Sequence, residues 1–169
     1  PEVKKKATVE YGAKLIECEP TMKSRESTAA IIAEETGATF IHPSNQMNVI
    51  MGQSTATQEL LGDFPDLDII FSPVGGGGLI AGTALAALEF GNECRVFGGE
   101  PAEADDACRS MMSGKIEKNK TTNTIADGLI SNLGDINFPI IREHVDRITR
   151  VTEKEIIAAM RLIWERMKL

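Results

Sequence analysis

Four consecutive glycines, Gly75 to Gly78, stand between an apolar stretch and a segment with helical periodicity. Glycine inside a helix or strand costs ~0.5–1 kcal/mol relative to alanine, so four together indicate a backbone that another group must approach closely. At a strand-to-helix junction, free backbone N–H groups and the positive end of the helix dipole favour an anion. This glycine run therefore predicts an anion site. The alternative is a tight turn that only lets the strand and helix pack closely, for which one or two glycines would suffice.

Extended and helical patterns alternate along the rest of the chain. Such alternation predicts an α/β fold with a parallel sheet, right-handed crossovers and helices on both faces, which is a three-layer αβα arrangement. The near-continuous apolar run Leu67–Phe71 favours a strand buried on both sides. We expect Ser24 to cap a helix that ends before Gly37. The predicted strands cover residues 14–19, 38–43, 67–74 and 95–100, and the predicted helices cover 1–12, 24–36, 48–63, 79–91, 139–146 and 151–169.

The last of these segments has the clearest helical periodicity. Thr152 and Glu155 have the spacing of a capping box, which predicts the start of the helix. Its apolar residues recur on one face, so we expect that face to pack in the core rather than to line a ligand pocket. The chain stops inside this pattern without a capping residue, which indicates a truncated helix. The apolar residues are Ile156, Ile157, Met160, Ile163, Trp164 and Met167.

Charge and cysteine usage exclude several classes of protein. The net charge of −7 and a pI near 4.9 argue against a nucleic-acid partner, because phosphate-backbone binding needs a basic face. No apolar run is long enough to span a membrane. Cys18, Cys94 and Cys108 are odd in number and widely spaced, which favours reduced thiols that serve as packing residues in a cytoplasmic protein.

Nucleotide-binding motifs are the main rivals for the glycine run. No Lys-Ser or Lys-Thr follows it, which excludes a nucleotide P-loop. A dinucleotide site is the serious alternative, because Gly76, Gly78 and Ala81 satisfy the G-x-G-x-x-A spacing. Glu100 ends the following strand, near the place of a ribose-binding acid. The alternative function is therefore an NAD(P)-dependent oxidoreductase, although the run has two more glycines than that fingerprint needs.

Several segments in order carry a resemblance to a known family: "YGAKLIECEP", "EETGATFIHP", "VIMGQSTATQEL", "PVGGGGLIAGTALA", "GGEPAEADDACRS", "TIADGL" and "FPIIREHVD". The chain resembles the serine racemase and threonine/serine dehydratase family, which are pyridoxal-phosphate enzymes of fold type II, the fold of the tryptophan synthase β subunit. The resemblance implies that residues 1–44 complete a small domain and that residues 45–169 are part of a large cofactor-binding domain. It also implies a serine or threonine substrate, a homodimer and a nucleotide effector near Lys168.

The same resemblance assigns residues to a cofactor site. It implies that pyridoxal 5'-phosphate is held by its phosphate at Gly75, Gly76, Gly77 and Gly78, with the amide of Leu79 contributing. The backbone at Gly128, in "TIADG", would approach the cofactor ring, whereas the residues themselves are equally compatible with a plain turn. His42 receives no role, because a lone histidine without an acid or cysteine at ligand spacing is usually structural. His144 lies beside Glu143 and Asp146 on a predicted helix, and we expect it to belong to a solvated face.

A divalent-metal site is implied in the segment "EPAEADD". By the resemblance, Glu100, the carbonyl of Ala104 and the carboxylate of Asp106 would bind Mg²⁺, Mn²⁺ or Ca²⁺, and such oxygen ligands suit these hard cations. The alternative is that the acids of this segment lie in the first turn of a helix, where its dipole favours them.

The family carries its cofactor on a lysine in a Ser-x-Lys-x-Arg-Gly motif, and residues 1–169 contain no match to it. The resemblance therefore predicts an internal piece of the enzyme that lacks this lysine and is inactive alone, with no catalytic residue to assign. A non-catalytic phosphate-binding fragment is the remaining alternative.

Overall fold

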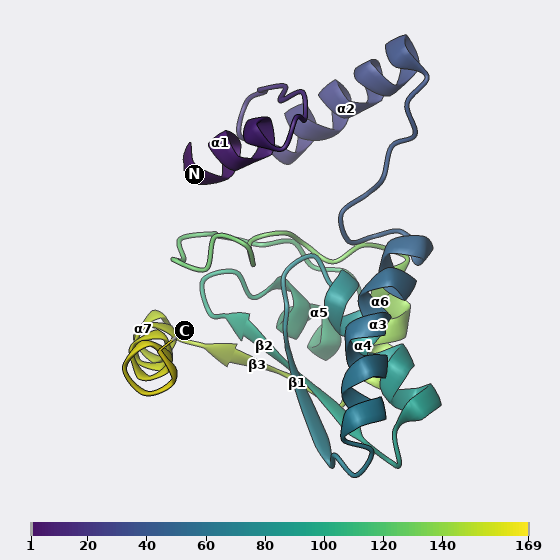
Figure 1. Ribbon diagram of the computed structural model, residues 1–169, viewed down its shortest axis with the longest axis vertical. Helices are drawn as coiled ribbons and strands as arrows, with labels where there is room; N and C mark the ends of the chain where they lie inside the picture. The colour runs from purple at the N-terminus through teal and green to yellow at the C-terminus, as the bar shows by residue number, and fades with distance from the viewer. Residues whose placement is uncertain (1, 169) are drawn as a thin grey trace. The chain divides into compact units, whose positions relative to one another are not determined.

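The computed structural model describes residues 2–168. It divides into two compact units, Pro1–Ile41 and His42–Leu169. The first unit contains two helices, α1 (Glu2–Glu10) and α2 (Met22–Thr36), coloured purple to blue in Figure 1. The strands predicted at 14–19 and 38–43 are wrong, because both segments are irregular. An extended segment is stable only when a partner strand satisfies its N–H and C=O groups, and the described residues of this unit form no such ladder.

The boundaries of α2 correct one prediction and confirm another. The helix is capped by Thr21 rather than Ser24, since the Thr21 hydroxyl accepts the N–H of Ser24 at 3.1 Å. Gly37 follows the helix in the left-handed region, with φ of 69°, and its N–H donates to the carbonyl of Ala33. Ser24 thus lies at the third position of the helix, where its amide needs a capping partner.

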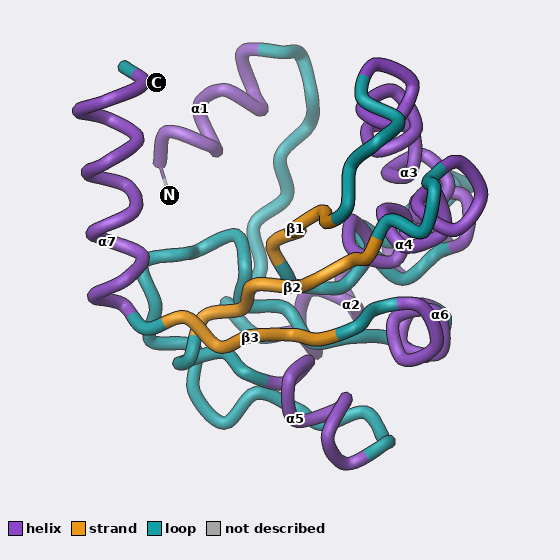
Figure 2. The backbone as a smooth tube through the Cα atoms, turned by 90° about the horizontal axis from the view of Figure 1, so that it is seen from below, coloured by secondary structure: helices purple, strands orange, loops and turns teal. Residues whose placement is uncertain are grey.

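The second unit is an α/β structure with a parallel sheet, as predicted. The sheet has the order β1-β2-β3. In its register Phe71 of β1 lies opposite Phe97 of β2, which lies opposite Arg147 of β3. Figure 2 shows the three strands side by side. The strands are β1 (Ile69–Pro73), β2 (Arg95–Pro101) and β3 (Arg147–Val151), and the helices are α3 (Met47–Asp63), α4 (Gly78–Phe90), α5 (Asp106–Ser113), α6 (Asn137–His144) and α7 (Glu153–Leu162), which continues as a π-helix over Ile163–Met167.

Helices of the described chain cover one face of this sheet. Val96 and Ile148 point into a core that α3, α4, α5 and α6 complete. The prediction that Leu67–Phe71 is buried on both sides is wrong here, because Ile69 is 45% exposed and Phe71 is 69% exposed. Phe71 instead stacks on Phe97 with ring centroids 5.5 Å apart. The described residues therefore provide the sheet and one of the two predicted helical layers.

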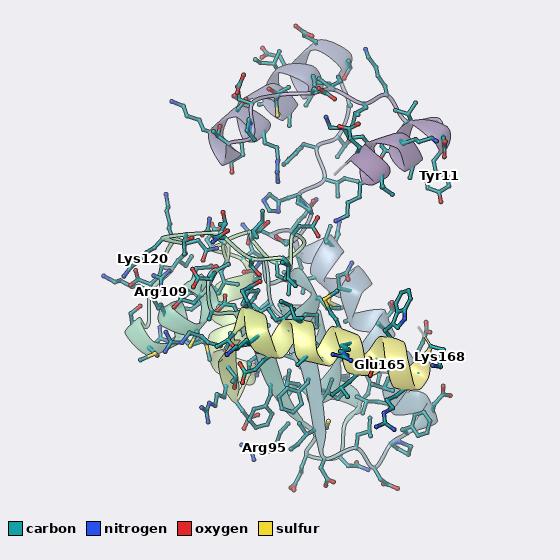
Figure 3. The ribbon with its side chains drawn as sticks, turned by 90° about the vertical axis from the view of Figure 1, so that its left-hand side faces the viewer. Tyr11, Arg95, Arg109, Lys120, Glu165 and Lys168 are labelled. Atoms are coloured by element: carbon teal, nitrogen blue, oxygen red, sulfur yellow. The ribbon has the colours of Figure 1, made fainter. Side chains whose placement is uncertain are left out.

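Helix α7 differs from its prediction in packing but not in its start. The capping box is present, with the N–H of Thr152 donating to Glu155 Oε2 at 2.8 Å. The predicted core face is wrong, since α7 has no buried residue and Trp164 in the following π-helix is 73% exposed. Figure 2 shows α7 leaving the sheet at the end of β3, and Figure 3 shows its side chains around the yellow helix, with Glu165 labelled.

The three cysteines are free, and their environments differ. Cys108 packs against the core and Cys94 is half-buried, which agrees with the prediction of packing residues. Cys18 is exposed, so that prediction is wrong for Cys18, which lies in the irregular segment between α1 and α2.

Close contact between α3 and α4 depends on Gly82. A Cβ at this position would lie 2.5 Å from the carbonyl oxygen of Ile50 and 2.7 Å from the amide nitrogen of Ser54. We expect Gly82→Ala to lower the free energy of unfolding by ~1–3 kcal/mol, because backbone atoms of α3 must move. Urea unfolding of the full-length protein measures this change.

Gly52→Ala is the matched control for that substitution. Gly52 is an exposed glycine of α3 with no atom within 4 Å of its missing Cβ. Alanine there should raise the free energy of unfolding by up to ~1 kcal/mol through helix propensity alone. Equal effects of the two substitutions would contradict the assignment of Gly82 as a packing glycine.

Candidate functional site

The glycine run joins the carboxyl end of β1 to the N-terminus of α4. Gly77 is the N-cap of α4 and adopts the left-handed conformation, with φ of 83°. The first bond of the helix is donated by the N–H of Ala81 to the carbonyl of Gly77 at 3.1 Å. Within the described residues, the N–H groups from Gly75 to Leu79 donate to no protein acceptor. Unpaired amides at a helix N-terminus are an arrangement suited to binding an anion.

The missing side chains of the glycine run face protein rather than solvent. A Cβ on Gly76 would overlap the Ser44 side chain, and a Cβ on Gly77 would lie 2.6 Å from Leu133 Cδ2. Close packing thus accounts for the absence of side chains, as the tight-turn interpretation expects. It does not account for the unpaired amides, which the anion-site interpretation explains.

Gly128 lies beside the glycine run although the two are far apart in sequence. Its carbonyl oxygen is 3.1 Å from the position of a Cβ on Gly75. The turn is closed by the N–H of Leu129, which donates to the carbonyl of Ala126 at 2.8 Å. No atom lies within 4 Å of a Cβ on Gly128 itself. The structure therefore brings together the glycines that the family resemblance assigned to one cofactor.

A buried asparagine, Asn137, contacts the same loop and was missed from the sequence. Its side chain is fully buried. Its Nδ2 donates to the carbonyl of Gly76 at 2.7 Å and to that of Ser44 at 3.2 Å, and its Oδ1 accepts the N–H of Gly134 at 3.0 Å. The available signal was a single polar residue in the apolar stretch "INFPII". Such a signal marks a buried hydrogen-bonding site only when the partners are known.

His42 stabilises the turn that contacts the glycine run. Its Nδ1 accepts the N–H of Asn45 at 2.7 Å and that of Ser44 at 3.1 Å. The N–H of His42 donates to Gln46 Oε1 at 3.0 Å. These bonds agree with the structural role that the sequence favoured.

Glu100 and Asp106, the acidic pair, are each only 1% exposed. The two Glu100 carboxylate oxygens accept the N–H groups of Ala107 and Cys108, each at 2.9 Å. Burial raises the pKa of Glu100 to about 7, against the lowering effect of these two amides. Asp106 Oδ2 accepts the N–H of Leu133 at 2.9 Å, and burial raises the pKa of Asp106 to about 6. Asp106 Oδ1 is buried and accepts no hydrogen bond from the described residues, although the nearby Asn119 side chain lowers the pKa of Asp106 in part.

The neighbouring acid Asp105 differs from Asp106 because it is paired. Its carboxylate accepts from Arg109 Nε at 2.7 Å and from Arg150 at 3.3 Å, with Arg109 labelled in Figure 3. Burial alone would raise the pKa of Asp105, but hydrogen bonds to the two arginines outweigh burial and lower it. Asp106 is therefore the acid of this segment that keeps a buried oxygen without a partner.

The three proposed metal ligands suit a hard cation by their chemistry. Ala104 is 1% exposed, and its carbonyl accepts no hydrogen bond from the described residues. Two carboxylates and one carbonyl are the oxygen donors that Mg²⁺, Mn²⁺ and Ca²⁺ prefer. No group of three or more His, Cys, Asp or Glu side chains able to hold a metal exists within residues 2–168. A site here would accordingly use backbone oxygen and solvent as well as the acidic pair.

The dinucleotide interpretation is wrong for Glu100. A ribose-binding acid must present its carboxylate to a ligand hydroxyl. Glu100 is buried and turned toward the amides of α5, so its carboxylate is not presented to a ligand outside the sheet. Glu100 therefore belongs to the interior beneath α5 and not to a dinucleotide site.

Comparison with known proteins assigns the chain to a family. The family model described as "Pyridoxal-phosphate dependent enzyme" matches residues 1–169. The chain belongs to the pyridoxal-phosphate dependent enzyme family. A serine racemase of Dictyostelium discoideum is 45% identical over 171 residues, which cover 100% of this chain and 53% of that protein.

Solved structures of this family have the same fold. A maize serine racemase superposes with a TM-score of 0.97 at 41% identity, covering 100% of this chain and 51% of that one. The processed form of a threonine deaminase of Solanum lycopersicum superposes with a TM-score of 0.92 at 28% identity, covering 100% of this chain and 47% of that one. The chain thus spans about half the length of the relatives it matches. Its assignment to fold type II is confirmed, and residues 1–169 make up part of that fold.

Proposed function

We propose that residues 1–169 are part of a pyridoxal-phosphate-dependent enzyme that racemises or deaminates serine or threonine. The observation that supports this most directly is the row of unpaired N–H groups from Gly75 to Leu79 at the N-terminus of α4. It lies in a chain that is 45% identical along its length to a serine racemase.

The residues of this chain would bind and orient the cofactor rather than transfer protons. The amides of the glycine run, with the positive end of the α4 dipole, would hold the phosphate group. The backbone at Gly128 would lie beside the ring, where the absence of a side chain leaves room. Once bound, pyridoxal phosphate supplies an electron sink that acidifies the α-proton of the amino acid.

We further propose a divalent cation, Mg²⁺, Mn²⁺ or Ca²⁺, at Glu100, the carbonyl of Ala104 and Asp106. The partnerless Asp106 Oδ1 supports this site, because a buried carboxylate oxygen is costly unless it is hydrogen-bonded or coordinates a cation. The cation would have a structural role, since it would tie the start of α5 to β2.

Other assignments of the sequence remain proposals about the whole enzyme. They are a small domain ending at residue 44, a large domain from residue 45, a homodimer, a nucleotide effector near Lys168 and a cytoplasmic location. Lys168 is exposed and follows the π-helix in the left-handed conformation, with φ of 61°. No helix among residues 2–168 has the length and apolar character needed to cross a membrane.

A trapping experiment on the full-length protein tests the proposed function. We expect the purified protein to absorb light close to the visible range. Borohydride reduction should fix the absorbing cofactor covalently to one lysine, which peptide mass spectrometry would identify. Tight binding of a nicotinamide cofactor without such absorption would favour an oxidoreductase. Reversible binding of pyridoxal phosphate without a trapped lysine or turnover of serine would favour a non-catalytic phosphate-binding protein.

A further inference from the structure

Asn137 uses its buried side chain to join three separate segments of the second unit. Its two amide hydrogens go to the carbonyls of Gly76 and Ser44, and its oxygen accepts from Gly134. These partners belong to the glycine run, to the turn that precedes α3, and to the turn that precedes α6. One side chain thus sets the spacing of all three segments, with every bond made to backbone.

Asn45 makes the reciprocal set of bonds from the turn before α3. Helix α6 begins at Asn137, and its own N-cap residue, Ile136, makes no side-chain capping bond. Asn45 Oδ1 instead accepts the N–H groups of Ile136 at 2.9 Å and Asn137 at 3.3 Å, while its Nδ2 donates to Asp135 at 2.8 Å. Asn45 therefore caps α6 from outside the helix and holds Asn137 in place.

The bond from Asn137 to Gly76 fixes the direction of an amide in the glycine run. The C=O of Gly76 and the N–H of Gly77 belong to one peptide group, and no peptide bond of the described chain is cis. In a trans peptide these two groups point in opposite directions. Holding the Gly76 carbonyl at 2.7 Å from Asn137 Nδ2 therefore directs the Gly77 N–H away from Asn137.

We propose that Asn137 is a positioning residue for the phosphate site: it orients the Gly77 N–H toward the ligand by hydrogen-bonding the Gly76 carbonyl, and Asn45 supports it. This inference rests on the proposed function, since the ligand is the phosphate group of pyridoxal phosphate. It assigns a role in cofactor binding to a residue that would itself contact no cofactor atom.

Asn137→Asp in the full-length protein tests the proposal. The aspartate has the same shape and can still accept the Gly134 N–H, but it cannot donate to Gly76 or Ser44. We expect the dissociation constant for pyridoxal phosphate to rise ~10-fold or more, as for loss of a buried hydrogen bond. The ³¹P chemical shift of the bound phosphate should also move, because an amide beside it has turned.

Thr57→Val is the control for a purely structural effect. Thr57 is buried and donates to Thr83 at 3.2 Å between α3 and α4, so its loss should lower stability without changing cofactor affinity. If Asn137→Asp does not fold, Asn45→Ala replaces it, with an expected loss of affinity of ~3-fold or more.

The possible results separate this inference from the proposed function. Unchanged affinity for pyridoxal phosphate and an unchanged ³¹P shift in folded Asn137→Asp, or in Asn45→Ala where it replaces that variant, would overturn the inference. An equal loss of affinity in Thr57→Val would also overturn it. Failure of the wild-type protein to bind pyridoxal phosphate would instead overturn the proposed function, and the inference with it.

Discussion

Replacing Gly77 by alanine in the full-length protein should weaken pyridoxal phosphate binding by ~100-fold, equivalent to ~2.7 kcal/mol. Gly77 has φ of 83°, a conformation that costs an L-residue ~1–2 kcal/mol. The added Cβ would also lie 2.6 Å from Leu133 Cδ2 and 3.0 Å from Asn137 Oδ1. Relief of the backbone strain and of these close contacts requires rotation of the Gly77–Gly78 peptide. That rotation would turn the N–H of Gly78 out of the row of amides. Fluorescence titration of the apoprotein with pyridoxal phosphate measures the change.

Gly114→Ala separates this effect from backbone strain alone. Gly114 has φ of 74° at the end of α5, and a Cβ there would meet nothing nearer than the Arg142 guanidinium at 3.8 Å. The control should lose ~1–2 kcal/mol of stability through the same conformational penalty while retaining cofactor affinity. A Gly77→Ala protein that binds the cofactor as tightly as Gly114→Ala does would show that the glycine run serves packing only.

Local signals in the sequence predicted the elements that depend on neighbouring residues. The glycine run, the capping box at Thr152 and the left-handed Gly37 each need only a few adjacent residues, and each occurs where predicted. Hydrophobic periodicity predicted less, because it indicates that a face is buried without indicating what buries it. Phe71 and Trp164 carry such patterns and are exposed in the described chain.

The candidate site shows the same limit at the level of single side chains. The residues predicted the glycine run and the family resemblance added Gly128, but Asn137 acts on Gly76 across 61 residues of sequence, a contact that only the fold creates. Likewise, "EPAEADD" contains several acids of equal promise. The family resemblance selected Asp106 among them, and the structure adds that Arg150 of β3 pairs with Asp105 across 45 residues of sequence. Polar residues in turns are common enough that neither assignment follows from residue type.

Asp106→Asn should abolish the stabilisation of the full-length protein by divalent cations. For a cation present at ~100 times its dissociation constant, that stabilisation is ~2.7 kcal/mol in the wild-type protein. The asparagine can still accept the N–H of Leu133, but it removes the charge of the buried oxygen Oδ1 that we propose as a ligand. Without cation the variant should be no less stable than the wild type, since loss of this charge also removes repulsion of the buried Glu100. Thermal unfolding in chelator and in Mg²⁺, Mn²⁺ or Ca²⁺ measures both quantities.

Asp105→Asn is the control for this substitution, because it removes the adjacent acid and leaves the proposed ligands in place. Its bonds to Arg109 and Arg150 would weaken, so it should lose up to ~1 kcal/mol of stability with or without cation. The cation should nevertheless stabilise it as much as it stabilises the wild type. If cations stabilise Asp106→Asn to the same extent, or leave the wild type unaffected, then the acidic pair serves only the N-terminus of α5. In that case the carboxylate of Glu100, with its two amides from α5, would be a capping group rather than a metal ligand.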